Sequence, residues 1–168
     1  MDKRLSVSSS PHIRSDITTR RLMLDVIIAL IPATAAGIYY FGVRAALLIA
    51  ITTLSCVGWE YVTRKALKRS NTIGDLSAVV TGLILALNLP PQLPVWMAVV
   101  GAFFAIVVVK QLFGGIGQNF VNPALAARAM LVVAYGSRMT FWTAPFNSAS
   151  NMADAVSSAT PLGILKEG

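Results

Sequence analysis

The sequence predicts an all-α integral membrane protein with about five transmembrane helices. Of its 168 residues, 55% are hydrophobic and only 12% are charged, and the mean hydropathy is +0.68. The apolar residues form long blocks instead of the amphipathic stripes of a soluble helical domain. Lysine and arginine gather in alternate connections between these blocks, as they do in multi-pass membrane proteins. A soluble domain of this length would need far more polar surface to cover its core.

The predicted elements follow from the apolar blocks in order. Residues 1–21 are polar and lack the apolar core and cleavage site of a signal peptide, so the first span must act as its own insertion signal. The lysine and arginine counts given below predict that this N-terminal segment is cytoplasmic. Two spans are predicted at residues 22–41 and 43–62, each close to the roughly 20 residues that cross a bilayer, with Gly42 as the tight turn between them. Three further spans are predicted at residues 76–89, at residues 95–113 and at about residues 123–135. The bundle then covers residues 22–136 and leaves residues 137–168 as a C-terminal segment.

The third and fifth predicted spans are short and lie beside irregular sequence. The third ends in Asn-Leu-Pro-Pro at 88–91, and the fifth follows Gly-Gly-Ile-Gly at 114–117 and the pair Asn122-Pro123, where proline suits the first turn of a helix. Interrupted helices of this kind mark binding sites in transporters, while ordinary short helices with interfacial loops explain them equally well. The glycine-rich turn lacks the GxGxxG spacing and the preceding strand of a phosphate site, so close helix packing or a backbone crossing is expected there.

The distribution of basic residues predicts the orientation in the membrane. One face holds eleven of them: Lys3, Arg4, Arg14, Arg20, Arg21, Arg64, Lys65, Lys68, Arg69, Lys110 and Arg128. The other face holds only Arg44, Arg138 and Lys166. The N-terminus is therefore predicted in the cytoplasm and the C-terminal segment outside, with the chain in the cytoplasmic (inner) membrane of the cell. The net charge of +7 is explained by this topology and by anionic headgroups, not by nucleic-acid binding.

Three acidic residues lie within or beside the apolar blocks. Asp25 and Glu60 each have an arginine four residues away, Arg21 and Arg64, which predicts exposed ion pairs at the cytoplasmic ends of two helices. Asp75 is expected to cap, or to lie in the first turn of, the third helix. A role in a cation pathway is the alternative for all three, because acidic groups at membrane depth are costly and are often functional.

The chain has one cysteine and one histidine. Cys56 lies within an apolar block and cannot form an internal disulfide or hold an iron–sulfur cluster alone, so we expect a small packing residue. His12 lies in the polar N-terminal segment without a second ligand at metal-binding spacing, and no metal site is predicted.

The C-terminal segment contains the stretch Asp-Ala-Val-Ser-Ser-Ala-Thr at residues 154–160. The small side chains of Ser157, Ser158 and Ala159 leave the Thr160 hydroxyl accessible, and Pro161 favours an extended backbone at Thr160. Such a hydroxyl suits covalent attachment of a group by another enzyme. An ordinary polar loop with Asp154 or Ser157 as a helix N-cap is the alternative that these residues alone leave open.

Four segments of the chain resemble the N-terminal half of the RnfD/NqrB family. They are Ser-Ser-Pro-His-Ile-Arg at 9–14, Thr-Gly-Leu-Ile-Leu-Ala-Leu-Asn-Leu-Pro-Pro at 81–91, Gly-Gly-Ile-Gly-Gln-Asn-Phe-Val-Asn-Pro-Ala at 114–124, and residues 154–162. The Ser-Pro-His-Ile-Arg start favours RnfD. The resemblance covers nearly the whole chain and implies the first half of a two-repeat helical bundle of about ten spans, so we expect the chain to be incomplete.

The resemblance also implies a cofactor. In this family the phosphate of an FMN is joined to a threonine in the motif Asp-x-x-Ser/Thr-Gly-Ala-Thr, which a flavin transferase recognises. Thr160 matches the acceptor, while Asp154, Ser157 and Ala159 match the other motif positions and Ser158 stands where glycine is usual. A second flavin such as riboflavin is a further expectation, with no residues assigned to it.

The implied function is that of a membrane subunit of an Rnf-type complex that moves electrons between ferredoxin and NAD and couples this to Na⁺ or H⁺ transport. No activity is expected from the chain alone, and its partners would be the other subunits of the complex, the flavin transferase and the lipid bilayer. The alternatives are an NqrB-like subunit of a Na⁺-pumping NADH:quinone oxidoreductase, a small-solute channel or transporter, and a purely structural membrane scaffold.

Overall fold

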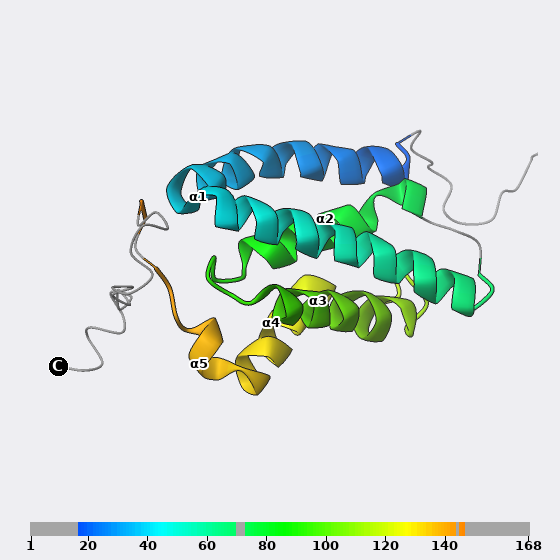
Figure 1. The fold of residues 1–168 in the computed structure, drawn as a ribbon. Helices are drawn as coiled ribbons and strands as arrows, with labels where there is room; N and C mark the ends of the chain where they lie inside the picture. The colour runs from blue at the N-terminus through cyan, green and yellow to red at the C-terminus, as the bar shows by residue number, and fades with distance from the viewer. Residues whose placement is uncertain (1–16, 70–72, 144, 147–168) are drawn as a thin grey trace, which may run out of the picture.

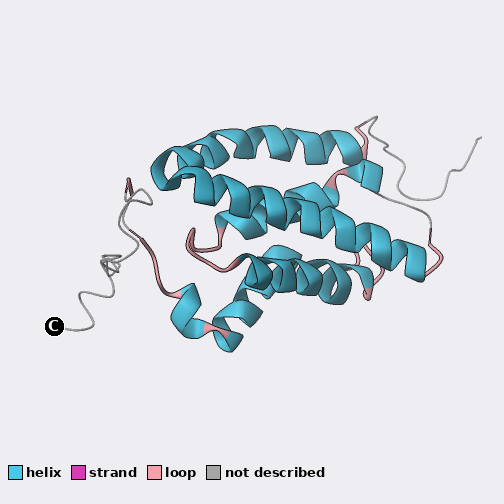
Figure 2. Ribbon diagram, in the orientation of Figure 1, coloured by secondary structure: helices cyan, strands magenta, loops and turns pink. Residues whose placement is uncertain are grey.

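The computed structural model describes residues 17–69, 73–143 and 145–146, and these residues are mostly helical (Figures 1 and 2). Its elements are α1 (Thr19–Ala66), the 3₁₀ turn η1 (Ile73–Asp75), α2 (Ser77–Leu87), α3 (Val95–Phe103), the π-helix η2 (Phe104–Gln111), α4 (Pro123–Ala134) and α5 (Gly136–Met139). The helical segments predicted from the apolar blocks are all present.

Helix α1 consists of two antiparallel helices. Gly42 has φ 72° and ψ −162°, which is not helical, and α1 doubles back on itself in Figure 1. These angles confirm the predicted break at Gly42. Glycine suits the turn because it has no Cβ and adopts a positive φ without steric strain. We call this turn the α1 hairpin.

Among the described helices, only α1, taken as one helix, is long and apolar enough by length and hydropathy to cross a membrane, and it includes the hairpin. The helices Ser77–Leu87, Val95–Gln111 and Pro123–Ala134 are apolar but shorter. The number of crossings and their direction therefore stay predictions.

The core joins the second half of α1 to α2, α3, η2 and α4. Leu48, Leu85, Met97, Ala127 and Leu131 are among its buried residues. Small residues allow close approach between helices: an ideal Cβ on Gly82 would lie 2.7 Å from the Thr53 Cα. Packing through small residues is typical of helices that associate within a membrane.

The first half of α1 has no buried residue, since the buried residues of α1 begin at Ala45. Its exposed side chains include Leu22, Ile28 and Ile31. A continuous apolar surface of this kind is unfavourable in water, whereas lipid or another protein surface covers it without cost. The fold therefore agrees with an all-helical membrane protein.

The fourth predicted span differs from an ordinary helix in its second half. Residues 95–103 are α-helical, but Phe104–Gln111 form a π-helix, and its i→i+5 pattern continues in the bond from Leu112 N–H to the Val107 carbonyl (3.1 Å). Eight residues are a long run for this rare conformation, which occurs mostly as single turns at functional sites.

The connection between η2 and α4 is the glycine-rich turn. Gly114, Gly115 and Gly117 have φ values of 116°, 107° and 80°, and an ideal Cβ on Gly115 would lie 3.0 Å from Arg64 Nη2. The nearest neighbour of Gly115 is thus a side chain at the end of α1, and the expected backbone crossing or close helix packing stays a prediction. The start of α4 is as predicted, because the Asn122 side chain accepts a hydrogen bond from the Ala124 N–H (3.0 Å).

Candidate functional site

The residues of the predicted flavin-attachment motif lie outside the described residues. These are Asp154, Ser157, Ser158, Ala159 and Thr160, and His12 also lies outside. Cys56 is described and is fully buried against Ala78, Ala102 and Ile106, so the predicted packing role is confirmed.

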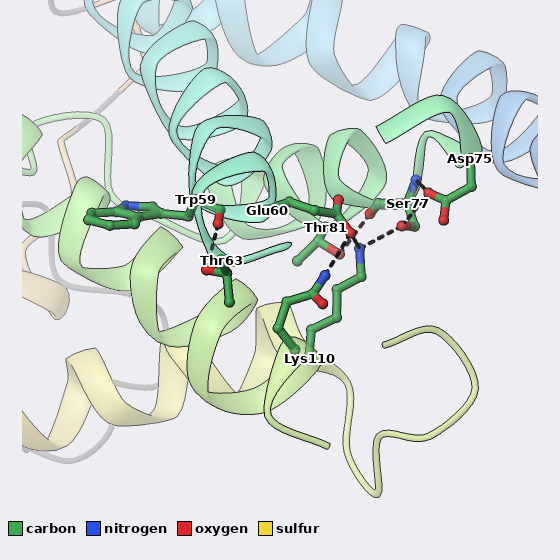
Figure 3. A network of polar contacts seen from close by, with 8 residues as sticks. Trp59, Glu60, Thr63, Asp75, Ser77, Thr81 and Lys110 are labelled. Carbon is green, nitrogen blue, oxygen red and sulfur yellow. Dashed lines mark hydrogen bonds and ion pairs between the residues drawn. The ribbon is translucent and has the colours of Figure 1, made fainter. Parts of the chain in front are cut away.

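The structure instead reveals a buried polar network where α1, α2 and η2 meet (Figure 3). Its centre is an ion pair between Glu60 of α1 and Lys110 of η2, with 2.8 Å between Lys110 Nζ and Glu60 Oε1. The Glu60 side chain is 0% exposed and the Lys110 side chain 2%. We call Glu60, Lys110, Gln111, Ser77 and Asp75 the buried charge network.

The prediction of an exposed ion pair at Glu60 is wrong. The charged end of this residue points into the bundle, toward Lys110, and its helical neighbour Arg64 is buried as well. The other predicted pair is also wrong, because Asp25 is exposed and the structure shows no ion pair between it and Arg21, although both residues are described. Spacing of four residues shows which side chains share a helical face, but not whether that face is buried.

The prediction of Lys110 as a loop cation at the cytoplasmic surface is also wrong. Its ammonium group donates to Glu60 and, at 2.6 Å, to Ser77 Oγ. The next residue, Gln111, is also fully buried and donates from Nε2 to the same oxygen, Glu60 Oε1 (2.8 Å).

The π-helix carries two consecutive side chains that donate to one carboxylate oxygen. Lys110 and Gln111 are its last two residues, and both bond to Glu60 Oε1. The unusual helix and the network therefore occur in the same segment of the chain.

The network continues to the start of α2. The Ser77 hydroxyl accepts from Lys110 and donates to Asp75 Oδ1 (2.6 Å), which also accepts the Ser77 N–H (2.9 Å). Asp75 therefore caps the first turn of α2, as predicted, although Leu76 holds the N-cap position. Thr81 Oγ1 donates to the Ser77 carbonyl (2.9 Å).

This arrangement buries two opposite charges inside the bundle, and their hydrogen bonds connect α1, α2 and η2. One carboxylate oxygen receives two donors, which offsets part of the desolvation cost of the charge. Gln111 Oε1 is buried and has no hydrogen-bond partner among the described residues. No group of three or more His, Cys, Asp or Glu side chains that could hold a metal occurs in the described part of the chain.

A second polar contact joins α2 and α4. Arg128 Nη1 donates to Asn88 Oδ1 (2.8 Å), and Asn88 Nδ2 donates to the Ile84 carbonyl (2.8 Å). Arg128 therefore bonds to the end of α2 but stays exposed. Without the two buried cations, Lys110 and Arg64, nine of the eleven basic residues on the predicted cytoplasmic face remain, against three on the other.

Comparison with known proteins decides the family. Residues 6–168 match the model of the NQR2, RnfD, RnfE family. The chain belongs to this family. The resemblance noted in the sequence is thereby confirmed.

Similar relatives in this family are the D subunits of oxidoreductase complexes. The chain is 51% identical to the D subunit of the Na⁺-translocating ferredoxin:NAD⁺ oxidoreductase complex of Acetobacterium woodii, over 98% of this chain and 50% of the relative. It is 44% identical to the D subunit of the proton-translocating ferredoxin:NAD⁺ oxidoreductase complex of Clostridium ljungdahlii, over 96% of this chain and 48% of the relative. For the D subunit of the ion-translocating oxidoreductase complex of Shewanella amazonensis the identity is 37%, over 95% and 53%. The chain thus spans about half the length of these relatives.

Proposed function

We propose that this family member belongs to a membrane subunit of an Rnf-type ion-translocating oxidoreductase complex, and that it carries a covalent FMN on Thr160. The observation that carries the proposal is the stretch Asp154 to Thr160, which lies within the family match and matches the attachment motif except at Ser158. The names of the relatives support an electron-transfer complex as the setting.

The membrane assignment rests on the helices and their surfaces. The five apolar helical segments, with α1 counted as two, agree with five crossings of the cytoplasmic membrane. The apolar first half of α1 lacks buried residues, as expected for a helix that faces lipid or another protein. The bias of nine basic residues to three supports a cytoplasmic N-terminus.

The beginning of the attachment segment supports an extracytoplasmic flavin. Phe146 N–H donates to the Tyr40 carbonyl at 2.8 Å, so the chain leaving α5 returns to the α1 hairpin. The hairpin lies at the opposite end of the bundle from the start of α2 (Figure 1). If the N-terminus is cytoplasmic, this end is outside, and so is the root of the segment that holds Thr160.

The bound FMN would supply one- or two-electron transfer, which no side chain of the chain provides. The Thr160 hydroxyl has the chemistry for the tether, because it can form a phosphoester when the transferase supplies the activation. Asp154, Ser157, Ser158 and Ala159 would present this hydroxyl to the transferase. The described residues would form the scaffold that holds the tether against the rest of the complex.

The coupling ion is either Na⁺ or H⁺, since one relative is named for each. A second flavin such as riboflavin remains part of the expectation for the full-length protein. None of the described residues is assigned to it.

Thr160→Ala tests the proposal directly. The full-length protein from its native host should carry the added mass of one FMN and show flavin fluorescence after denaturing electrophoresis. Both signals should be lost in the Thr160→Ala variant, because no other hydroxyl occupies the acceptor position of the motif.

Thr140→Ala is the matched control. Thr140 is an exposed threonine whose hydroxyl donates to the Gly136 carbonyl (2.9 Å) within its own helical turn, so its loss should leave the flavin signal unchanged. An unmodified wild-type protein from cells that contain the transferase would contradict the proposal and favour a scaffold or transporter function.

A further inference from the structure

Three aromatic side chains meet at the α1 hairpin, and we call them the aromatic cluster: Tyr39, Tyr40 and Phe146. All three pairs are edge-to-face, with centroid distances of 5.4 Å for the two tyrosines, 5.6 Å for Tyr39 and Phe146, and 5.2 Å for Tyr40 and Phe146. The bond from Phe146 N–H to the Tyr40 carbonyl fixes the backbone of the cluster.

The rings of the cluster contact one another but remain open on their outer side. Tyr39 is 72% exposed, Phe146 62% and Tyr40 44%. Phe146 has φ 61°, a left-handed conformation that is uncommon for a non-glycine residue and strained for a bulky one. The ring contacts and the hydrogen bond hold Phe146 in this conformation although its ring buries little surface within the chain.

The position of the cluster indicates what covers it. Thr160 follows Phe146 by 14 residues, which span at most about 50 Å when fully extended. A group on Thr160 is therefore within reach of the aromatic cluster, because the connecting segment starts at Phe146, which belongs to the cluster. The isoalloxazine of an FMN is planar and aromatic, and planar aromatic groups pack on exposed rings by stacking or by edge-to-face contact.

The positive charge of Arg44, next to the α1 hairpin, suits the phosphate of the same FMN. Arg44 lies two residues after Gly42, and its side chain donates a long hydrogen bond to the Gln92 carbonyl (3.5 Å). A phosphodiester at Thr160 carries a negative charge that a guanidinium can bind through paired donors. Few other cations are predicted on this side of the membrane.

We propose that Tyr39, Tyr40 and Phe146 form the platform on which the isoalloxazine ring of the Thr160-linked FMN packs. This inference rests on the proposed function and extends it, because it assigns the ring of the cofactor to residues outside the attachment motif. Packing on the platform fixes the distance and orientation of the flavin relative to the bundle.

The test measures the environment of the flavin, not the activity of the complex. The full-length protein is purified in flavinylated form, and flavin emission and its quenching by iodide are recorded, with the Thr160→Ala protein as the baseline for any other flavin. Contact with tyrosine quenches flavin emission, and packing shields the ring from iodide. Tyr39→Leu combined with Phe146→Leu should raise both the emission and the iodide quenching constant several-fold, at unchanged FMN stoichiometry.

The matched control is Phe120→Leu. Phe113 and Phe120 form another edge-to-face pair (5.0 Å) with exposed rings, but they lie beyond η2 at the opposite end of the bundle. The change at Phe120 should leave the flavin signals as in the wild type.

Tyr39→Phe combined with Tyr40→Phe keeps the test decisive if the first double variant fails to fold or to be flavinylated. It retains both rings but removes the two phenols that quench the flavin, so emission should rise while shielding from iodide persists. A flavinylated variant with wild-type emission would overturn the platform and leave the tyrosines as membrane-interface anchors. A wild-type protein without FMN on Thr160 would instead overturn the proposed function.

Discussion

Burial of the Glu60 and Lys110 charges costs free energy, and the ion pair between them offsets part of this cost. Transfer of either charge from water into the bundle costs several kcal/mol, which the ion pair and its hydrogen bonds must offset. The offset comes from three different helices, because Lys110 donates to Glu60 and Ser77, and Gln111 donates to Glu60. Loss of one member therefore affects more than one contact.

This dependence gives a prediction for Lys110→Met. The variant removes the Lys110 ammonium from the buried Glu60 carboxylate and should lose about 3–5 kcal/mol of stability. The double variant Glu60→Gln with Lys110→Met removes both charges and should recover most of that loss. Unfolding of the full-length protein in detergent, arranged as a double-mutant cycle, measures the coupling between the two sites.

Lys68→Met is the control for loss of a lysine. Lys68 is exposed at the end of α1, so its replacement should change stability little. Equal stability of the Lys110→Met protein and the double variant would show that the pair is not coupled as the structure indicates.

The contact between α1 and α2 depends on the absence of a side chain at one position. A Cβ on Gly82 would lie 2.7 Å from the backbone of Thr53 and 3.3 Å from the Cys56 Cβ. Backbone atoms cannot turn away as a rotamer can, so the two helices would have to separate. The same helix pair carries Glu60 and Ser77, and separation would stretch the buried charge network.

Gly82→Ala should therefore destabilise the protein by about 1–3 kcal/mol, the range for overpacking of a tight core. Gly58→Ala is a matched control on α1, because nothing lies within 4 Å of its ideal Cβ and alanine favours a helix over glycine by about 1 kcal/mol. In thermal unfolding measured in detergent, the midpoint temperature should fall for Gly82→Ala and not for Gly58→Ala. A lower midpoint for both variants would indicate a general intolerance of α1 and α2 to added methyl groups.

The elements also show which parts of the fold a sequence can reveal. Apolar blocks, the glycine at 42 and the Asn122-Pro123 pair predict where helices begin, turn and end, because these signals are local. Glu60 and Lys110 are 50 residues apart, and no local pattern states which helical faces meet. The available signal is the presence of opposite charges within apolar sequence, since each is costly at membrane depth unless it is paired. No local pattern predicts the π-helix that carries Lys110 either.

At the scale of the whole molecule, the two ends of the bundle differ in chemistry. One end has the buried charge network, the glycine-rich turn and most of the described lysine and arginine residues. The other has the α1 hairpin, the open aromatic cluster and the root of the C-terminal segment. In an ion-coupled redox protein, this division would separate the flavin outside the membrane from the charged groups near the cytoplasm.

The orientation predicts the side from which each end can be labelled. Val43 is exposed at the α1 hairpin and Lys68 is exposed at the other end of α1, while Cys56 is buried and can be replaced by alanine to remove background. In the Cys56→Ala protein, Val43→Cys should react with a membrane-impermeant maleimide in intact spheroplasts. Lys68→Cys should react only after the membrane is opened, since the positive-inside rule holds the Lys65 to Arg69 region in the cytoplasm. The reverse pattern would put the hairpin, the aromatic cluster and the root of the Thr160 segment in the cytoplasm, and a flavin attached there would reach cytoplasmic partners instead of those outside.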